Sequence, residues 1–453
     1  MNKYPLLSKV LVIGLLMFLL SIPLMMVHSA IEERSMNREA ATQDVARAHA
    51  GEQTITGPVL VVPYTETFLR KVAVGDKGQT REELVTQSHV AIRFPTTMET
   101  RSRLQTETRW RGVFPVKVYT SVNESTGQFV WSEVEAKEKN GQIALGQPSL
   151  LMGVSDLRGL LNAPQLKVDG RVVQVAPARA AQKLPLPLAA PLNLSQLRAG
   201  AVLPFALQLD LAGTGRIGWV PLADENRVQL QSTWPHPNFG GDFLPRSRAI
   251  NDQGFEASWS VPSLSTQAQQ QFLQTGDKSG ALESFSVSLD DPVDIYRLTD
   301  RATKYGMMFI LLTFAAFFVL EMVKRWRIHP MQYLMIGAAM VLFFLLLLSI
   351  SEHLGFMTAY LVASVACIGL LAHYLRHVLG GWSPGLMMSG LLVALYGVLY
   401  GILVSEDNAL MMGSLLLFGV LAAIMFVTRK VDWYSVMGSA PAAPHKPPAD
   451  TLR

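Results

Sequence analysis

Six apolar runs constrain this chain more than any other feature of its sequence. A helix needs about 20 predominantly apolar residues to cross a lipid bilayer, and each run approaches or reaches that length. The runs cover residues 10–27, 305–323, 331–350, 355–375, 384–404 and 409–428. The sequence therefore predicts a multi-pass membrane protein with one long polar region, residues 30–304, between its first two spans.

The first run is interpreted as an uncleaved membrane anchor. A cleavable signal peptide has an apolar core of about 7–15 residues, and this run is longer. His28-Ser29-Ala30 bears only a faint resemblance to a cleavage site. We therefore expect the first span to remain part of the protein.

Basic residues lie at alternate ends of the spans, as the positive-inside rule requires of cytoplasmic loops. They are Lys3, Lys9, Lys324, Arg325, Arg327, Arg376, Arg429 and Lys430. The two remaining short loops, residues 351–353 and 405–408, contain no Lys or Arg. This alternation predicts that both termini lie in the cytoplasm and that residues 30–304 lie outside, which is the periplasm if the cell is Gram-negative.

Charge and cysteine content add two expectations. The net charge of +4 comes largely from the residues that set topology, so no nucleic-acid partner is predicted. The single cysteine, Cys367, lies inside the fourth run. The polar region therefore contains no disulfide and must depend on its own hydrophobic core.

The polar region changes character after Gly57-Pro58. Short alternating runs rich in Val, Thr and aromatic residues follow, separated by Gly, Pro, Asn or Asp, which is typical of strands and hairpins. Only residues 155–161 and 265–274 favour helix. The proline-rich stretch 184–195 could divide the region in two, and the glycines of 212–218 are interpreted as a hairpin turn.

These patterns predict an α+β membrane protein: a six-helix transmembrane bundle with a large, mostly antiparallel, sandwich-like periplasmic β domain inserted between helices 1 and 2. The expected segments are a cytoplasmic N-terminus with the first span (1–29), a helical stalk (30–56), the β domain (57–303), a five-helix bundle (304–430) and a largely disordered cytoplasmic tail (431–453).

Catalytic motifs are missing from the sequence. It contains no G-x-S-x-G, H-E-x-x-H or P-loop pattern. His49, His89 and His236 lie far apart, and the adjacent acids at 82–83 and 290–291 are typical of solvated strands or loops. We therefore predict no catalytic residue, no metal site and no cofactor. The centres of the spans lack ionisable residues, which disfavours an ion-coupled carrier.

The stretch "STWPHPNFGGDFLP", residues 232–245, combines three aromatic side chains with prolines and a glycine pair. It reads as a rigid, aromatic-packed loop beside a sheet edge, and its alternative role is a partner-binding loop. The residues that would form that binding surface are Trp234, His236, Phe239, Asp242 and Phe243. Catalysis by the histidine and aspartate is disfavoured, because no nucleophile accompanies them.

This stretch resembles the corresponding segment of the CreD family of bacterial inner-membrane proteins, also called cell envelope integrity proteins. Other segments match as well: "GPVLVVPYTE" (57–66), "YRLTDRATKYGMMFILLTFAAFF" (296–318), "HPMQYL" (329–334), "LLLLSISEHLGF" (345–356) and "VTRKVDWY" (427–434). The resemblance implies a multi-pass protein with one large periplasmic domain, linked to envelope integrity, envelope stress and tolerance to certain colicins. It supplies no activity, cofactor or site residue.

We therefore expect a non-enzymatic envelope protein whose periplasmic domain binds or organises an envelope protein or lipid while the bundle resides in the bilayer. Arg301 and Lys304 mark the domain–membrane junction, where their side chains could reach lipid phosphates. Two alternatives remain open: a transporter or lipid-handling protein, and a periplasmic-facing hydrolase. The oligomeric state is not indicated.

Overall fold

The chain divides into two compact units: Met1–Asn37 with Val293–Arg453, called the membrane unit, and Arg38–Pro292, called the β unit. The computed structural model describes residues 5–74, 79–138, 140–178, 184, 186–193, 199–275, 282–291, 293–324, 326, 328–378, 381–405 and 408–429. The predicted tail, residues 431–453, lies outside these ranges.

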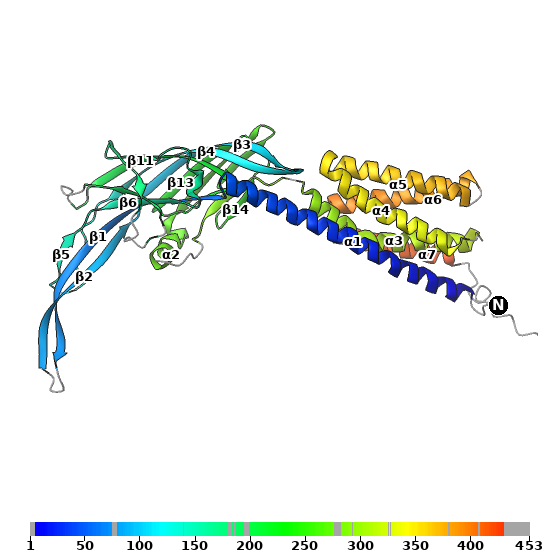
Figure 1. Cartoon of the computed structure of the whole chain (residues 1–453), viewed down its shortest axis with the longest axis horizontal. Helices are drawn as coiled ribbons and strands as arrows, with labels where there is room; N and C mark the ends of the chain where they lie inside the picture. The colour runs from blue at the N-terminus through cyan, green and yellow to red at the C-terminus, as the bar shows by residue number, and fades with distance from the viewer. Residues whose placement is uncertain are drawn as a thin grey trace, which may run out of the picture. The chain divides into compact units, whose positions relative to one another are not determined.

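Within the described residues, six helices are long and apolar enough to cross a membrane, which confirms the expected number (Figure 1). They are α1 (Pro5–Ala48), α3 (Ile295–Lys324), α4 (Pro330–Leu354), α5 (Phe356–Val378), α6 (Trp382–Val404) and α7 (Ala409–Thr428). The first helix continues without a break beyond its apolar part and ends at Ala48, shortly before Gly51. The helical stalk predicted for residues 30–56 is therefore too long, because a strand already begins at Gln53.

Local chemistry fixes the starts of two of these helices. The Asp294 carboxylate accepts the N–H groups of Tyr296 and Arg297 at the start of α3. His329 caps α4 by accepting the N–H of Met331, and the Gln332 side chain reciprocates. These contacts satisfy N–H groups that have no partner within the helix.

The β unit contains two sheets, which Figure 1 shows with most of their strands labelled. The first comprises β14 (Asn238–Gly241), β17 (Phe285–Ser288), β12 (Arg216–Trp219), β1 (Gln53–Val74), β6 (Ser149–Val154), β10 (Leu188–Pro191), β9 (Ala176–Pro177), β2 (Gln79–Arg93) and β5 (Gln142–Leu145). The second comprises β15 (Ser247–Asn251), β16 (Gly254–Pro262), β13 (Glu225–Ser232), β3 (Thr97–Arg111), β4 (Phe114–Val130), β11 (Val202–Thr214), β7 (Gln165–Val168) and β8 (Arg171–Val173).

A shared hydrophobic core joins the two sheets into a sandwich. Strand β13 alternates exposed and buried residues, and its Val228 and Leu230 enter the core from the second sheet. Ile217 and Trp219 enter the same core from the first sheet. A smaller cluster covers the opposite face of the first sheet and includes Phe272 of helix α2 (Ala268–Thr275). The expected mostly antiparallel sandwich is thus confirmed, although β1–β12 and β3–β13 are parallel pairs.

Two expectations for the β unit are wrong. Residues 212–218 do not form a hairpin, because β11 pairs within the second sheet whereas β12 pairs with β1 and β17 of the first. The chain crosses from the second sheet to the first at this point, and the buried side chains of β12 therefore enter the core from the first sheet. The proline-rich stretch 184–195 does not divide the region either, since its strand β10 pairs with β6.

Candidate functional site

The predicted partner-binding loop runs from the end of β13 through β14 to the approach of β15. Its Trp234 indole N–H donates to the carbonyl of His236 at 2.7 Å, and the two rings meet edge to face. The ammonium of Lys117 lies 4.7 Å from the Trp234 ring centroid, within cation–π range. These contacts fold the Trp234–His236 part of the loop onto itself.

The second half of the loop packs into an aromatic cluster. Phe239 contacts the rings of Phe255 and Trp259 edge to face. The Trp259 indole donates to the carbonyl of Phe243 at 3.2 Å, and the Asp242 carboxylate accepts the N–H of Ser284 at 2.9 Å. His236 and Asp242 therefore have separate partners, and the contacts describe a rigid corner whose solvent-facing atoms remain available to a partner.

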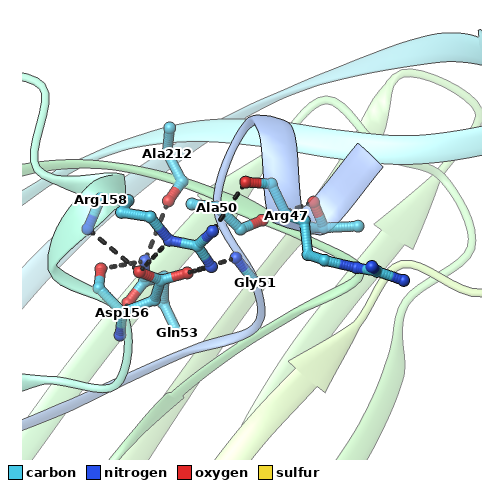
Figure 2. Close-up of polar contacts among 8 residues, drawn as sticks. Arg47, Ala50, Gly51, Gln53, Asp156, Arg158 and Ala212 are labelled. Carbon is cyan, nitrogen blue, oxygen red and sulfur yellow. Dashed lines mark hydrogen bonds and ion pairs between the residues drawn. The ribbon is translucent and has the colours of Figure 1, made fainter. Parts of the chain in front are cut away.

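A second polar cluster surrounds the end of α1, and we call it the helix joint (Figure 2). The Asp156 carboxylate accepts the N–H of Gly51 at 2.9 Å. It also accepts two side-chain N–H groups of Arg158, at 2.9 and 2.6 Å. The remaining guanidinium nitrogen of Arg158 donates to the carbonyl of Arg47 at 2.6 Å, within the last turn of the helix.

Gln53 supplies the buried half of the helix joint. Its side chain is fully buried and donates to the carbonyls of Asp156 at 2.9 Å and Ala212 at 3.2 Å, while its oxygen accepts the Asp156 N–H. The Thr214 hydroxyl donates to the carbonyl of Ala50 at 2.7 Å. The backbone that leaves α1 is thus bonded to strand β11 and to the segment after β6.

Two ionisable groups, one in the helix joint and one beside it, have pKa values below their ordinary ones. Hydrogen bonds from Arg158 hold the pKa of the Asp156 carboxyl well below its ordinary value, and the Gly51 N–H contributes in the same direction while burial opposes it. Burial lowers the pKa of His49, and the positive charge of Arg109 adds to that effect. The Nε2 atom of His49 is buried and has no hydrogen-bond partner.

The three histidines of the β unit have unrelated surroundings. His49 lies beside the helix joint and His236 against Trp234. His89 Nε2 lies 3.7 Å from the carboxylate of Glu66, which is fully buried and accepts the N–H of Glu138. Among the residues that the structure describes, no three His, Cys, Asp or Glu side chains gather as metal ligands.

The predicted junction residues lie on the first turns of α3. Lys304 forms an ion pair with Asp300 at 2.6 Å, and Asp300 also contacts His28 of α1 at 3.2 Å. Arg301 is half-buried on the same helix. Acidic and basic groups are therefore paired at this end of α3, in the membrane unit.

A partly buried ion pair lies at the other end of α3. Lys9 contacts the Glu321 carboxylate, which also accepts the Tyr333 hydroxyl at 3.0 Å and the Ile328 N–H at 3.2 Å. Charges inside a bundle are tolerated when they are paired and hydrogen-bonded. Sequence reasoning missed this pair, because 312 residues separate Lys9 from Glu321.

Sequence reasoning also missed the helix joint. One signal was available, since Asp156 stands before a short helical turn, Leu157–Gly159, and caps it by accepting the N–H of Arg158. Aspartate at such a position is typical of a helix start. The contacts of Asp156 with Gly51 and Gln53 could not be predicted from the neighbouring sequence.

Comparisons with known proteins agree with the sequence motifs. The family model described as "Inner membrane protein CreD" matches residues 5–434. The Escherichia coli (strain K12) inner membrane protein CreD is 34% identical over 437 residues, covering 96% of this chain and 95% of its own.

Two solved structures show weak likenesses to the chain. An M1 zinc metallopeptidase from Deinococcus radiodurans gives a TM-score of 0.23 at 9% identity, covering 43% of this chain and 41% of that one. The InvG secretin domain from Salmonella gives a TM-score of 0.07 at 8% identity, covering 36% and 61%. The family match and the six apolar helices settle the classification: this chain is a multi-pass member of the CreD family of inner membrane proteins.

Proposed function

We propose that this protein is a non-enzymatic support of cell envelope integrity, in which the β unit binds or organises an envelope component. The observation that carries the proposal is the helix joint. Helix α1 runs unbroken from the first span into the β unit, where Asp156, Arg158 and Gln53 fix its end. A module that organises an envelope component from the membrane needs a fixed attachment of this kind, and family membership supports the same role.

The experiment removes the gene and measures colicin survival and envelope permeability to detergent, then restores the chain in three forms. The intact chain should restore the parental phenotype. The double variant Gln53→Ala/Asp156→Ala should fail to restore it, because the α1 end is released. The matched control is Glu225→Ala, which breaks an exposed Glu–Arg pair of the same two-residue spacing on β13. Equal restoration by all three chains at equal abundance contradicts the proposal.

The orientation belongs to the same proposal: both termini in the cytoplasm and residues 30–304 in the periplasm. The alternating basic loops support it. Single cysteines placed at exposed Leu264 and exposed Trp382, in a Cys367→Ser background, test it with a membrane-impermeant maleimide. Labelling of the first site alone in intact cells is expected. Labelling of the Trp382→Cys site alone would show that the orientation is the opposite of the proposed one.

The loop of Trp234, His236, Phe239, Asp242 and Phe243 is proposed as a partner-contacting corner. Leu244, within this loop, is a suitable probe position, since 71% of its surface is exposed. A photocrosslinking residue at Leu244 should give a discrete protein or lipid adduct in cells. The same probe at Leu264, which is 99% exposed and lies outside the loop, should not. Identical adduct patterns at the two positions would remove the loop from the proposal.

A further inference from the structure

An open groove lies on the outer face of the second sheet, where β13 ends and β16 begins while β3 continues. Its volume is about 380 Å³, which lies within the range of small-molecule sites, about 300–1,000 Å³. Because one water occupies about 30 Å³ of liquid, the groove has room for roughly a dozen waters.

The strand register explains why polar side chains line this groove. Gln231 of β13 stands opposite Arg103 of β3 on one side and Glu256 of β16 on the other. The inward neighbours, Leu104 and Phe255, are buried. Since side chains alternate between the two faces of a strand, the residues at 103, 231 and 256 all project outward. They form one polar row across three strands.

A second row lies two residues further along the same face. Gln105 extends β3, and Thr233 follows β13 where that strand leaves the ladder. Asn251 of β15 stands opposite Gly254 of β16, where the backbone of Ser232 and Thr233 lies too close to admit a larger residue. The groove therefore lies where β13 ends between β3 and β16, and polar groups border it.

The chemistry of the lining selects the ligand. Amide side chains at 105, 231, 251 and 253 and the hydroxyl of Thr233 can each donate and accept hydrogen bonds. The only ionisable lining residues are Arg103 and Glu256, which have opposite charges, and Arg103 is already paired with Glu124 at 3.2 Å. A lining of this kind favours neither an anion nor a cation. It suits a neutral molecule with many hydroxyl groups.

We propose that this groove binds a neutral, hexose-based glycan. The inference deepens the proposed function, because it names the class of envelope component that the β unit would recognise. Its test measures glycan binding directly, so it can fail or succeed independently of any envelope phenotype.

The test uses the full chain in lipid nanodiscs and two soluble probes, cellobiose and N,N′-diacetylchitobiose, which share their linkage and differ in the acetamido group. Saturable binding of at least one disaccharide is expected by calorimetry or by saturation-transfer nuclear magnetic resonance. Preference for the acetylated probe assigns the site to amino-sugar glycans, and preference for cellobiose to glucans. Absence of binding by both probes at millimolar concentration overturns the proposal.

Two variants of one strand locate the site. Gln231→Leu keeps the approximate side-chain shape but removes its hydrogen bonds, so affinity should fall about tenfold or more. Gln229→Leu is the matched control, because Gln229 is exposed on the same face of β13 and lies outside the groove. Its affinity should be unchanged. Equal affinities of the two variants, both with native circular dichroism, would place any glycan binding elsewhere and overturn the assignment.

Discussion

At the scale of single residues, Asp156 has the most consequential contacts in the β unit. Its carboxylate joins Gly51, just after α1, to Arg158, and Arg158 in turn holds the Arg47 carbonyl. Only 16% of its side chain is exposed, so water replaces these hydrogen bonds poorly. An acid at this position therefore stabilises a connection between segments that lie 105 residues apart.

Asp156→Ala should reduce the free energy of unfolding of the β unit by about 2 kcal/mol, because charge-assisted hydrogen bonds are lost and the Gly51 N–H keeps no partner. For a unit of this size the melting temperature should fall by about 4–8 °C. The melting temperature is measured on the purified full chain by thermal unfolding, which is followed by the circular dichroism signal of β structure. Glu225→Ala, which breaks an exposed ion pair, should change the free energy of unfolding by less than about 1 kcal/mol. Equal effects of the two variants would contradict the role given to the helix joint.

The depressed pKa of His49 makes stability depend on pH. The unfolded chain binds a proton at His49 near pH 6.5, whereas burial and Arg109 disfavour the proton in the fold. Stability is therefore highest above about pH 6.5 and falls as the pH drops below it. His49→Gln should flatten the change in melting temperature between pH 7.5 and 5.5. The pKa of Asp156 is also depressed, but its protonation lowers stability only below about pH 4. If the melting temperature of the His49→Gln variant changes between pH 7.5 and 5.5 as much as that of the parent chain, His49 is not the cause of the pH dependence.

At the scale of elements, the crossover from β11 to β12 depends on two glycines for different reasons. Gly215 has a φ of +73° and open space around it, so its requirement is conformational. A side chain at Gly213 would meet the ring and hydroxyl of Tyr119 within 2.4 to 3.0 Å, so its requirement is steric. Tyr119 cannot move freely, because its hydroxyl donates to the Arg216 carbonyl at 2.7 Å.

Gly215→Ala should therefore cost about 1 kcal/mol, the strain of a left-handed residue. Gly213→Ala should cost more, about 2–3 kcal/mol, because a buried aromatic ring has to shift. Denaturant unfolding of the two variants measures this difference in the free energy of unfolding. It is obtained from their transition midpoints, provided that the two variants show the same dependence of unfolding free energy on denaturant concentration. If Gly215→Ala proves the more destabilising variant, the crossover geometry described here is wrong.

The same crossover shows where sequence reasoning reaches its limit. Spans and strands are predictable because burial repeats locally, as in the alternation of β13 or the apolar length of α4. Whether a strand pairs with its neighbour is decided by distant partners. Strand β12 pairs with β1 and β17 rather than with β11, and Gln53 meets Asp156 across 103 residues. Nothing in residues 212–218 carries that information.

At the scale of the whole molecule, the order of elements along the chain argues for a supporting role. The β unit is inserted between the first span and the remaining five, so both of its ends continue into membrane helices. The first connection is α1, fixed by the helix joint within the β unit. The second is the start of α3, where Arg301 and Lys304 lie near Asp300 in the sequence and Lys304 pairs with it. Basic side chains at a membrane surface attract anionic lipid headgroups by about 1 kcal/mol each.

Replacing both Arg301 and Lys304 with alanine should therefore increase colicin sensitivity or detergent permeability without lowering the amount of protein. The charge-preserving double variant Arg301→Lys/Lys304→Arg is the matched control and should behave as the parent chain, since it keeps two cations at the start of α3. Survival assays together with immunoblots of membrane fractions measure both quantities. A parental phenotype in the alanine variant would show that these cations only anchor the helix. A defect in the charge-preserving variant as well would assign the effect to side-chain packing instead of charge, because the attraction to lipid phosphates requires only the positive charges.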